Sequence, residues 1–262
     1  MSALPAEVLP RRDAPLPDAG ARWALFLDVD GCLVEFAPSP EQVTIAPALL
    51  ALLDGLRSGL GGALAIISGR TLDELDRMFA PLTFACAGQY GLVRRAADGS
   101  KHRAALPPAP AMESIRAACL ALLPRFPGLK LEDKGTSIAL HYRSTPEIGE
   151  AVTIAAAEIV APFEGLYEVQ PGAMVQEIKP ATCSKGAALR AFWREPPFQG
   201  RQPVFVGDDH ADESAFAAAN ALGGISVAVG VHRETRAGYH LQHPADARRW
   251  LGELLHALAG GA

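Results

Sequence analysis

Polar side chains that could do chemistry follow directly after three short apolar runs in this chain. Each run ends in carboxylates or a hydroxyl: Asp28 and Asp30 after residues 23–27, Ser68 after residues 63–67, and Asp208 and Asp209 after residues 204–206. Short apolar runs that end at turn residues are typical of buried parallel strands. The carboxyl ends of such strands face one crevice in an open parallel sheet. We therefore expect these distant positions to meet in space.

Several carboxylates in one crevice repel one another, so the predicted site requires a cation. Oxygen ligands of this kind suit Mg²⁺, which takes a couple of carboxylates together with waters and phosphate oxygens. A single aspartate at such a place is better explained as a turn or helix-cap residue. Three clusters on successive strand ends favour the functional interpretation.

The two-residue spacing of Asp28 and Asp30 allows a division of labour. Asp28 could act as a nucleophile that carries a phosphoryl group, and Asp30 could protonate the leaving oxygen and later accept a proton from water. Ser68 and Lys185 both stand at predicted helix starts. Free N–H groups attract phosphate there, and a lysine ammonium could hold the nucleophile and the phosphoryl group together. Taken alone, each would be a helix-entry serine or an exposed surface lysine.

The elements that must position these residues alternate between strands and helices. Strands are predicted at residues 23–27, 63–67, 83–87, 204–206 and 225–229, and helices over 45–60, from Thr71 with its capping partner Glu74, over 184–194, 211–221 and near 244–258. Such alternation is typical of a doubly wound parallel α/β sheet. We therefore expect a Rossmann-like core.

Residues 108–176 interrupt this alternation. Prolines mark their start, and the pattern becomes helix, two strands, helix, two strands, after a hairpin predicted over residues 92–106. The four strands are predicted at residues 129–132, 137–142, 166–169 and 173–178. We expect a smaller α+β cap domain, inserted into a core of residues 21–107 and 177–262. Residues 1–20 are expected to form a flexible lead-in.

Composition limits the classes of function. The chain has 262 residues, of which 49% are hydrophobic and 20% charged, with a net charge of −5. This is a globular profile without the basic stripe of a nucleic-acid binder. Apolar runs fall far short of the roughly 20 residues of a membrane span, and no signal peptide is recognised. Four widely spaced cysteines favour reduced thiols and a cytoplasmic location. We expect a small-molecule partner rather than nucleic acid or membrane, and a monomer with an oligomer left open.

The polar motifs also resemble a known family. Its four core motifs correspond in order to Asp28-Val-Asp-Gly31, Ser68, Lys185 and Gly207-Asp-Asp-His-Ala-Asp212. These resemble the haloacid dehalogenase-like (HAD) phosphatases. Segments 65–70, 131–135, 139–143, 177–180 and 207–213 further resemble the trehalose-6-phosphate phosphatase family, over about residues 22–255. The resemblance implies a HAD-like fold with a C2-type cap. It also implies Mg²⁺-dependent hydrolysis of trehalose 6-phosphate through an aspartyl-phosphate, the last step of trehalose biosynthesis.

The resemblance implies a role for each matching residue. It makes Asp28 the nucleophile and Asp30 the acid and base, with Ser68 and Lys185 on the phosphoryl group. The implied Mg²⁺ ligands are Asp28, the backbone carbonyl of Asp30, and Asp208, together with Asp209 and with Asp212 nearby. The implied substrate-binding residues are Gly69, Arg70, Glu132, Lys134, His141, Arg143, Glu177 and Lys179. Ordinary exposed charge on sheet strands is the alternative for each cap residue.

Three positions depart from the family pattern. Cys32 replaces a usual threonine, Tyr90 a usual histidine and Val93 a usual glutamate. The last two favour, as the alternative function, hydrolysis of another sugar phosphate, of the sucrose or mannosylglycerate phosphate type. A metal-dependent glycosyltransferase and a phosphate-accepting signalling receiver are outside alternatives, which the lysine motif and the insert argue against. The junctions near 107–110 and 176–180 are the predicted hinges of a mobile cap.

Overall fold

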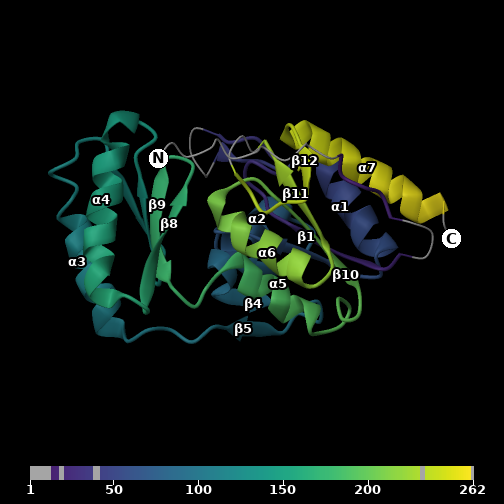
Figure 1. Ribbon diagram of the computed structural model, residues 1–262, viewed down its shortest axis with the longest axis horizontal. Coiled ribbons are helices and arrows are strands. Elements are labelled where there is room, and N and C mark those ends of the chain that lie inside the picture. Colours follow the sequence, from purple (N-terminus) through teal and green to yellow (C-terminus); the bar gives the residue numbers. More distant parts are fainter. Residues whose placement is uncertain (1–12, 18–20, 38–41, 231–233, 261–262) are drawn as a thin grey trace, which may run out of the picture.

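The chain is built on two β-sheets, an eight-stranded and a four-stranded one, as a computed structural model shows (Figure 1). The structure describes residues 13–17, 21–37, 42–230 and 234–260. Of the predicted lead-in over residues 1–20, all but 13–17 lies outside these described residues. The carbonyl of Pro15 accepts a hydrogen bond from Trp250 Nε1 at 3.0 Å, which ties this short segment to the last helix.

The larger sheet has the strand order β12-β11-β10-β1-β2-β3-β4-β5. Its parallel strands are β1 (Trp23–Leu27), β2 (Leu64–Ile67), β3 (Ala85–Gly88), β10 (Gln202–Gly207), β11 (Ile225–Val229) and β12 (Tyr239–Leu241). The antiparallel hairpin β4 (Val93–Arg95) and β5 (Lys101–Arg103) forms one edge. The predicted α/β class is thereby confirmed, while β12 was not predicted. Its three residues are all half-buried, so they lack the continuous apolar run that marks the central strands.

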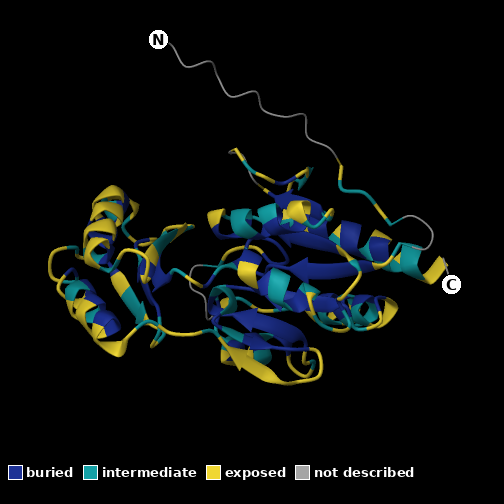
Figure 2. Cartoon of the chain, turned by 60° about the horizontal axis from the view of Figure 1, so that its bottom comes forward, coloured by how far each residue is buried: buried dark blue, intermediate teal, exposed yellow. Residues whose placement is uncertain are grey.

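Helices cover both faces of the larger sheet. They are α1 (Pro47–Gly59), α2 (Leu72–Phe79), α5 (Lys185–Trp193), α6 (Glu213–Ala221) and α7 (Pro244–Gly260). The chain crosses from β1 to β2 through α1 and, in the opposite direction along the sheet, from β10 to β11 through α6. Right-handed crossovers therefore place α1 and α6 on opposite faces (Figure 1). The central strands are buried throughout, and the outward sides of the helices are exposed (Figure 2).

The smaller sheet is antiparallel, with the order β6-β7-β9-β8. Its strands are β6 (Lys130–Asp133), β7 (Ile138–His141), β8 (Tyr167–Gly172) and β9 (Val175–Pro180), and its helices are α3 (Ala109–Leu120) and α4 (Gly149–Val160). Both helices pack on the outer side, so that β8 and β9 lie between them and the larger sheet (Figure 1). This unit buries its own apolar cluster, which includes Ile115, Ile138 and Val152.

Short 3₁₀ helices complete the secondary structure: η2 (Gln89–Gly91), η3 (Pro146–Ile148), η4 (Ala161–Phe163) and η5 (His210–Asp212). Two of them border the space between the sheets: η2 directly follows β3, and η5 follows β10 after two further residues. Within the described residues, no helix combines the length and the apolar character that a bilayer crossing demands.

Candidate active site

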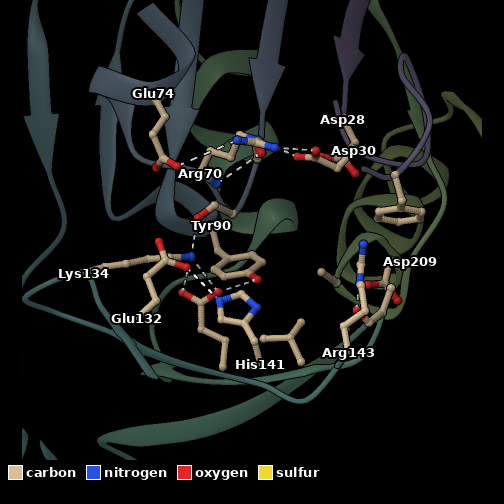
Figure 3. A pocket seen from close by; sticks show the side chains of 18 of the residues that line it. Asp28, Asp30, Arg70, Glu74, Tyr90, Glu132, Lys134, His141, Arg143 and Asp209 are labelled. Carbon is tan, nitrogen blue, oxygen red and sulfur yellow. Dashed lines mark hydrogen bonds and ion pairs between the residues drawn. The ribbon is translucent and has the colours of Figure 1, made fainter. Parts of the chain in front are cut away.

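A cavity of about 710 Å³ lies between the two sheets. One wall, here the core wall, comes from the larger sheet and carries Asp28, Asp30, Ser68, Gly69, Arg70, Tyr90, Lys185, Asp208 and Asp209. The opposite wall, here the cap wall, comes from the smaller sheet and carries Glu132, Lys134, His141, Arg143 and Glu177. Figure 3 shows Asp28, Asp30 and Arg70 on one side of the cavity and Glu132, Lys134 and His141 on the other. The structure thus brings together all but one of the side chains that the sequence analysis selected.

The centre of the core wall is a buried cluster of charges. Lys185 Nζ lies 2.8 Å from Asp28 Oδ1 and 2.7 Å from Asp212 Oδ1. Carboxylate oxygens of Asp28, Asp208 and Asp212 all lie within 4.8 Å of one another. These residues come from the ends of β1 and β10 and the start of α5, which the parallel pairing of β1 with β10 sets side by side. The predicted convergence at the strand ends is therefore found.

The electrostatics of this cluster show an excess of negative charge. Burial raises the pKa of Asp28 to about 7, although Lys185 acts in the opposite direction. Burial and the neighbouring Asp28 raise the pKa of Asp208 well above its usual range. Burial lowers the pKa of the Lys185 ammonium, but Asp212 and Asp28 outweigh it and the net pKa is raised. One cation cannot balance three carboxylates, so the site favours a further positive charge.

The loop after β10 positions two of these carboxylates. Asp212 Oδ2 accepts hydrogen bonds from the backbone N–H groups of Asp208 and Asp209, both at 2.9 Å. A Cβ on Gly31 would lie 2.0 Å from Asp208 Oδ2, and the φ of Gly31 is +79°. Glycine is therefore required for Asp208 to come this close. Within the described residues, the buried Oδ1 of Asp208 has no hydrogen-bond partner, as a cation ligand would.

Asp209 takes a different position from the one its sequence motif implied. Its carboxylate accepts a hydrogen bond from the backbone N–H of His210 at 2.5 Å and caps η5. It lines the cavity, but among the described residues the carboxylates that could share a metal are Asp28, Asp208 and Asp212. In the sequence, Asp209 looks as good a metal ligand as its neighbour Asp208. In the structure, the turn of η5 instead directs Asp212 toward Lys185.

The turn after β2 holds the next part of the core wall. Thr71 and Glu74 form the predicted capping box, which begins α2 directly after Arg70. Ser68 is buried, and its Oγ accepts a hydrogen bond from the backbone N–H of Arg70 at 3.2 Å. The Arg70 guanidinium donates two hydrogen bonds to the carboxylate of Asp30, both at 2.7 Å. This two-pronged contact fixes the orientation of Asp30.

The cap wall is built of paired charges. Glu177 is buried and accepts hydrogen bonds from Lys134 Nζ at 3.1 and 3.2 Å and from Ser137 Oγ at 2.8 Å. Burial lowers the pKa of Lys134, but Glu177 and Glu132 outweigh it and the net pKa is raised. His141 Nε2 lies 2.9 Å from Glu132 Oε2. These groups present fixed donors and acceptors to the cavity.

Arg143 closes one end of the cavity. Its Nη1 donates to the Ala37 carbonyl at 2.6 Å, and its guanidinium carbon lies 5.5 Å from the centroid of the Phe36 ring. Phe36 is 47% exposed and lines the same cavity. Arg143 was predicted from the sequence, whereas Phe36 was not, because a lone aromatic residue in a loop belongs to no recognisable pattern.

Lys179 is the selected residue that the structure does not bring to the cavity. Its side chain is 1% exposed, and its ammonium binds the carboxylate of Glu168 and donates to the Cys183 carbonyl at 2.5 Å. Side chains alternate between the two faces of a strand, so the sequence places Lys179 and Glu177, two residues apart on β9, on the same face. Its long side chain reaches the Cys183 turn instead of the cavity.

The three departures from the family pattern also fall in different places. Tyr90 lines the cavity and donates to Glu177. Val93 packs against the apolar core of the larger sheet. Cys32 is buried beside the aspartates, and burial together with the charge of Asp28 raises the pKa of its thiol well above its usual range. Tyr90 is therefore the departure that bears on a ligand.

This combination of a doubly wound sheet and an inserted antiparallel sheet, with a carboxylate–lysine cluster at the strand ends, defines a HAD-like fold. The chain belongs to the trehalose-phosphatase family, whose model matches residues 26–248. The resemblance seen in the sequence is thereby confirmed, and so is the predicted enzyme class, a phosphoric monoester hydrolase.

Individual relatives agree with this membership. The chain is 41% identical over 242 residues to the trehalose-6-phosphate phosphatase of Escherichia coli (strain K12), covering 92% of this chain and 90% of that protein. It is 41% identical over 208 residues to the probable trehalose-phosphate phosphatase of Sinorhizobium fredii, covering 79% and 78%. The solved C-terminal domain of the C. albicans trehalose-6-phosphate phosphatase has a similar fold, with a TM-score of 0.82 at 22% identity over 90% of this chain and 93% of that one.

Proposed function

We propose that this chain hydrolyses trehalose 6-phosphate to trehalose and inorganic phosphate. The observation that carries the proposal is the buried Asp28–Lys185–Asp212 cluster, which faces a cap wall of fixed hydrogen-bonding groups across one cavity. A phosphoryl group fits the first wall and sugar hydroxyls the second. The names of the two closely related bacterial proteins support the same substrate class.

In the proposed mechanism, Asp28 attacks the phosphorus atom, and the bond from phosphorus to the sugar oxygen breaks. Lys185 binds Oδ1 of Asp28, which leaves Oδ2 outside this ion pair. The ammonium orients the nucleophile and offsets negative charge on the transferring group. Ser68, at the end of β2, is the proposed hydroxyl contact of the phosphoryl group.

Asp30 is the proposed acid and base. It gives a proton to the leaving sugar oxygen, and it later takes one from the water that hydrolyses the aspartyl-phosphate, which releases phosphate and restores Asp28. The Asp30 side chain is 25% exposed, compared with 6% for Asp28. This access to solvent suits a group that exchanges protons, whereas the shielded Asp28 suits a nucleophile.

The donor set fits Mg²⁺. Asp28 and Asp208 are the proposed side-chain ligands, with the backbone carbonyl of Asp30. The buried, unpartnered Oδ1 of Asp208 and the excess of carboxylates over cations support this proposal among the described residues. We propose that Asp212 contributes to the site mainly by holding Lys185 and the β10 loop, because both of its oxygens already accept hydrogen bonds. When bound, Mg²⁺ would neutralise charge on the phosphoryl oxygens.

The smaller sheet is proposed to act as the cap of this site. The predicted boundary at residue 176 falls inside β9, so we place the end of the cap after Pro180. Hinges are then proposed near 107–110 and directly after β9. Four free, buried cysteines agree with the proposed cytoplasmic location. The proposed oligomeric state is a monomer.

A second candidate is a phosphatase for another sugar phosphate. It is favoured by Tyr90, because this departure from the family pattern contacts Glu177 inside the cavity. The test is release of inorganic phosphate from trehalose 6-phosphate, sucrose 6-phosphate and glucose 6-phosphate, with Mg²⁺ and with excess EDTA. We expect EDTA-sensitive release that is fastest from trehalose 6-phosphate. Faster release from another ester overturns the substrate, and no release from any ester overturns the mechanism.

A further inference from the structure

Tyr90 connects the two walls of the cavity. Its backbone belongs to η2, directly after β3 of the larger sheet, and its ring points into the cavity (Figure 3). Its hydroxyl donates to Glu177 Oε2 on β9 of the smaller sheet at 3.0 Å. We propose that Tyr90 is a positioning residue, which orients Glu177 for a sugar hydroxyl of the substrate and so favours sugar phosphates over smaller esters. This inference rests on the proposed function and names the residue that sets the sugar preference.

Two residues of η2 adopt strained backbone dihedral angles, and this conformation accompanies the contact. Gln89 and Tyr90 have φ angles of 48° and 56°, in the left-handed region that non-glycine residues rarely adopt. Both side chains then reach the smaller sheet, since Gln89 Nε2 donates to the Lys134 carbonyl at 3.3 Å and to Thr136 Oγ1 at 3.2 Å. Such strain persists where the surrounding structure requires it, typically at functional sites.

The Tyr90 ring is held on both sides. A Cβ on Gly69 would lie 2.8 Å from Tyr90 Oη and 2.9 Å from its Cζ, so glycine at position 69 makes room for the ring. The ammonium of Lys179 lies 5.4 Å from the ring centroid. Lys179 is itself fixed by Glu168 and the Cys183 carbonyl. The lysine that was expected to bind substrate therefore supports Tyr90 instead.

Tyr90 gives Glu177 a direct contact with the phosphate side of the cavity. Of its other donors, Ser137 contacts it from the smaller unit alone, whereas Lys134 Nζ also donates to the Gly69 carbonyl of the core wall at 3.3 Å. The Tyr90 hydroxyl holds it relative to the turn of Ser68 and Gly69. A carboxylate that binds a sugar hydroxyl must be fixed at a set distance from the reacting phosphorus, and Tyr90 provides the direct link, beside the indirect one through Lys134.

The test is Tyr90→Phe, which keeps the ring and removes only the hydroxyl. Kinetics are measured with Mg²⁺ on trehalose 6-phosphate and on p-nitrophenyl phosphate, an ester without sugar hydroxyls. Losing one hydrogen bond to a charged acceptor is expected to raise KM for trehalose 6-phosphate about 10- to 100-fold. The kcat for that substrate and both constants for p-nitrophenyl phosphate are expected to change by no more than about twofold, since the contact is remote from the phosphorus.

Tyr142→Phe is the matched control. Tyr142 is also buried, and its hydroxyl accepts a hydrogen bond from Gln176, the neighbour of Glu177 on β9, at 3.5 Å. It does not line the cavity, so this variant should leave both substrates unaffected. Equal losses on both substrates in Tyr90→Phe, or no loss on either, overturn the inference. If the unsubstituted enzyme cleaves p-nitrophenyl phosphate but not trehalose 6-phosphate, the proposed substrate is wrong, and the same comparison on its fastest sugar phosphate decides the role of Tyr90.

Discussion

The two walls of the cavity use the same kinds of side chain in opposite ways. On the core wall, three carboxylates share one ammonium, and Asp208 keeps an oxygen without a partner in the described part of the chain. On the cap wall, each carboxylate has its own cation or imidazole, as in Glu177 with Lys134 and Glu132 with His141. One wall is left with a charge imbalance, whereas the other is balanced.

This difference separates chemistry from recognition. An unbalanced buried cluster raises the pKa of Asp28 and Asp208 and attracts a cation or a transferring phosphoryl group. A balanced wall holds its groups in fixed orientations and can exchange hydrogen bonds with neutral hydroxyls at little electrostatic cost. Changes on the core wall should therefore affect every phosphate ester, and changes on the cap wall only esters that carry a sugar.

The largest effect is expected from removal of the proposed nucleophile. Asp28→Asn should lower kcat for both trehalose 6-phosphate and p-nitrophenyl phosphate by about 10⁴-fold or more, because no covalent intermediate can form. Phosphate release measures the loss, and Asp73→Asn, at an exposed position of α2, is the control. A folded Asp28→Asn protein that keeps a tenth of the activity would contradict the mechanism.

The charge imbalance of the core wall predicts a response to metal. Mg²⁺ at about 100 times its Kd should raise the melting temperature by about 5–10 °C, and EDTA should reverse the shift. Asp208→Asn should remove this response, because it removes the carboxylate with the free oxygen. Asp209→Asn should retain it, since Asp209 caps η5. Loss of the response in the second variant alone would restore Asp209 as the ligand that its motif implied.

Arg70→Lys tests whether the orientation of Asp30 matters equally for all esters. Lysine cannot donate the two parallel hydrogen bonds that Arg70 gives to Asp30. We expect kcat to fall about 10- to 100-fold on both substrates, since misplacing the acid affects proton transfer. Arg77→Lys, on the exposed side of α2, serves as control. A loss of activity confined to the sugar phosphate would show that Arg70 acts in sugar recognition and not in orienting Asp30.

The smallest effect is expected from Glu132→Gln on the cap wall. The side chains of Glu132 and His141 are 37% and 29% exposed, so the pair is worth about 0.5 kcal/mol or less, a shift of about 1–2 °C. The hydrogen bond with His141 lowers the pKa of Glu132 below its ordinary value of 4.5. Its stabilisation is therefore present above pH 4.5 and is lost as the pH falls through the lower, folded value.

Melting curves of Glu132→Gln and the unsubstituted protein across this pH range check the prediction, with Glu113→Gln on the exposed side of α3 as control. The gap between the two proteins should narrow toward low pH. A gap that widens with acid would show that the pair does not stabilise the fold through the ionised glutamate.

Much of the fold could be predicted, because the central strands are continuous apolar runs and their ends carry turn residues. Residues 23–27 and 225–229 form strands with the predicted bounds, and the capping box at Thr71 is present. The end of strand β9 could not be predicted, because its residues are of mixed polarity. They are buried by the neighbouring strands, and no apolar run in the sequence marks them. A predicted division at residue 176 therefore fell within a strand.

The strand-end motifs of the core wall could be predicted from the sequence alone, because the proposed nucleophile, its lysine and its loop aspartates occur at positions that a parallel sheet brings to one edge. Three contacts are evident only in the folded protein: Asp212 with Lys185, Lys179 with the Cys183 carbonyl, and Tyr90 with Glu177. These contacts depend on side-chain direction and on how the smaller sheet sits against the larger one. Neither the direction of these side chains nor the placement of the two sheets follows from a repeating sequence pattern, because each is set by packing between residues distant in the chain.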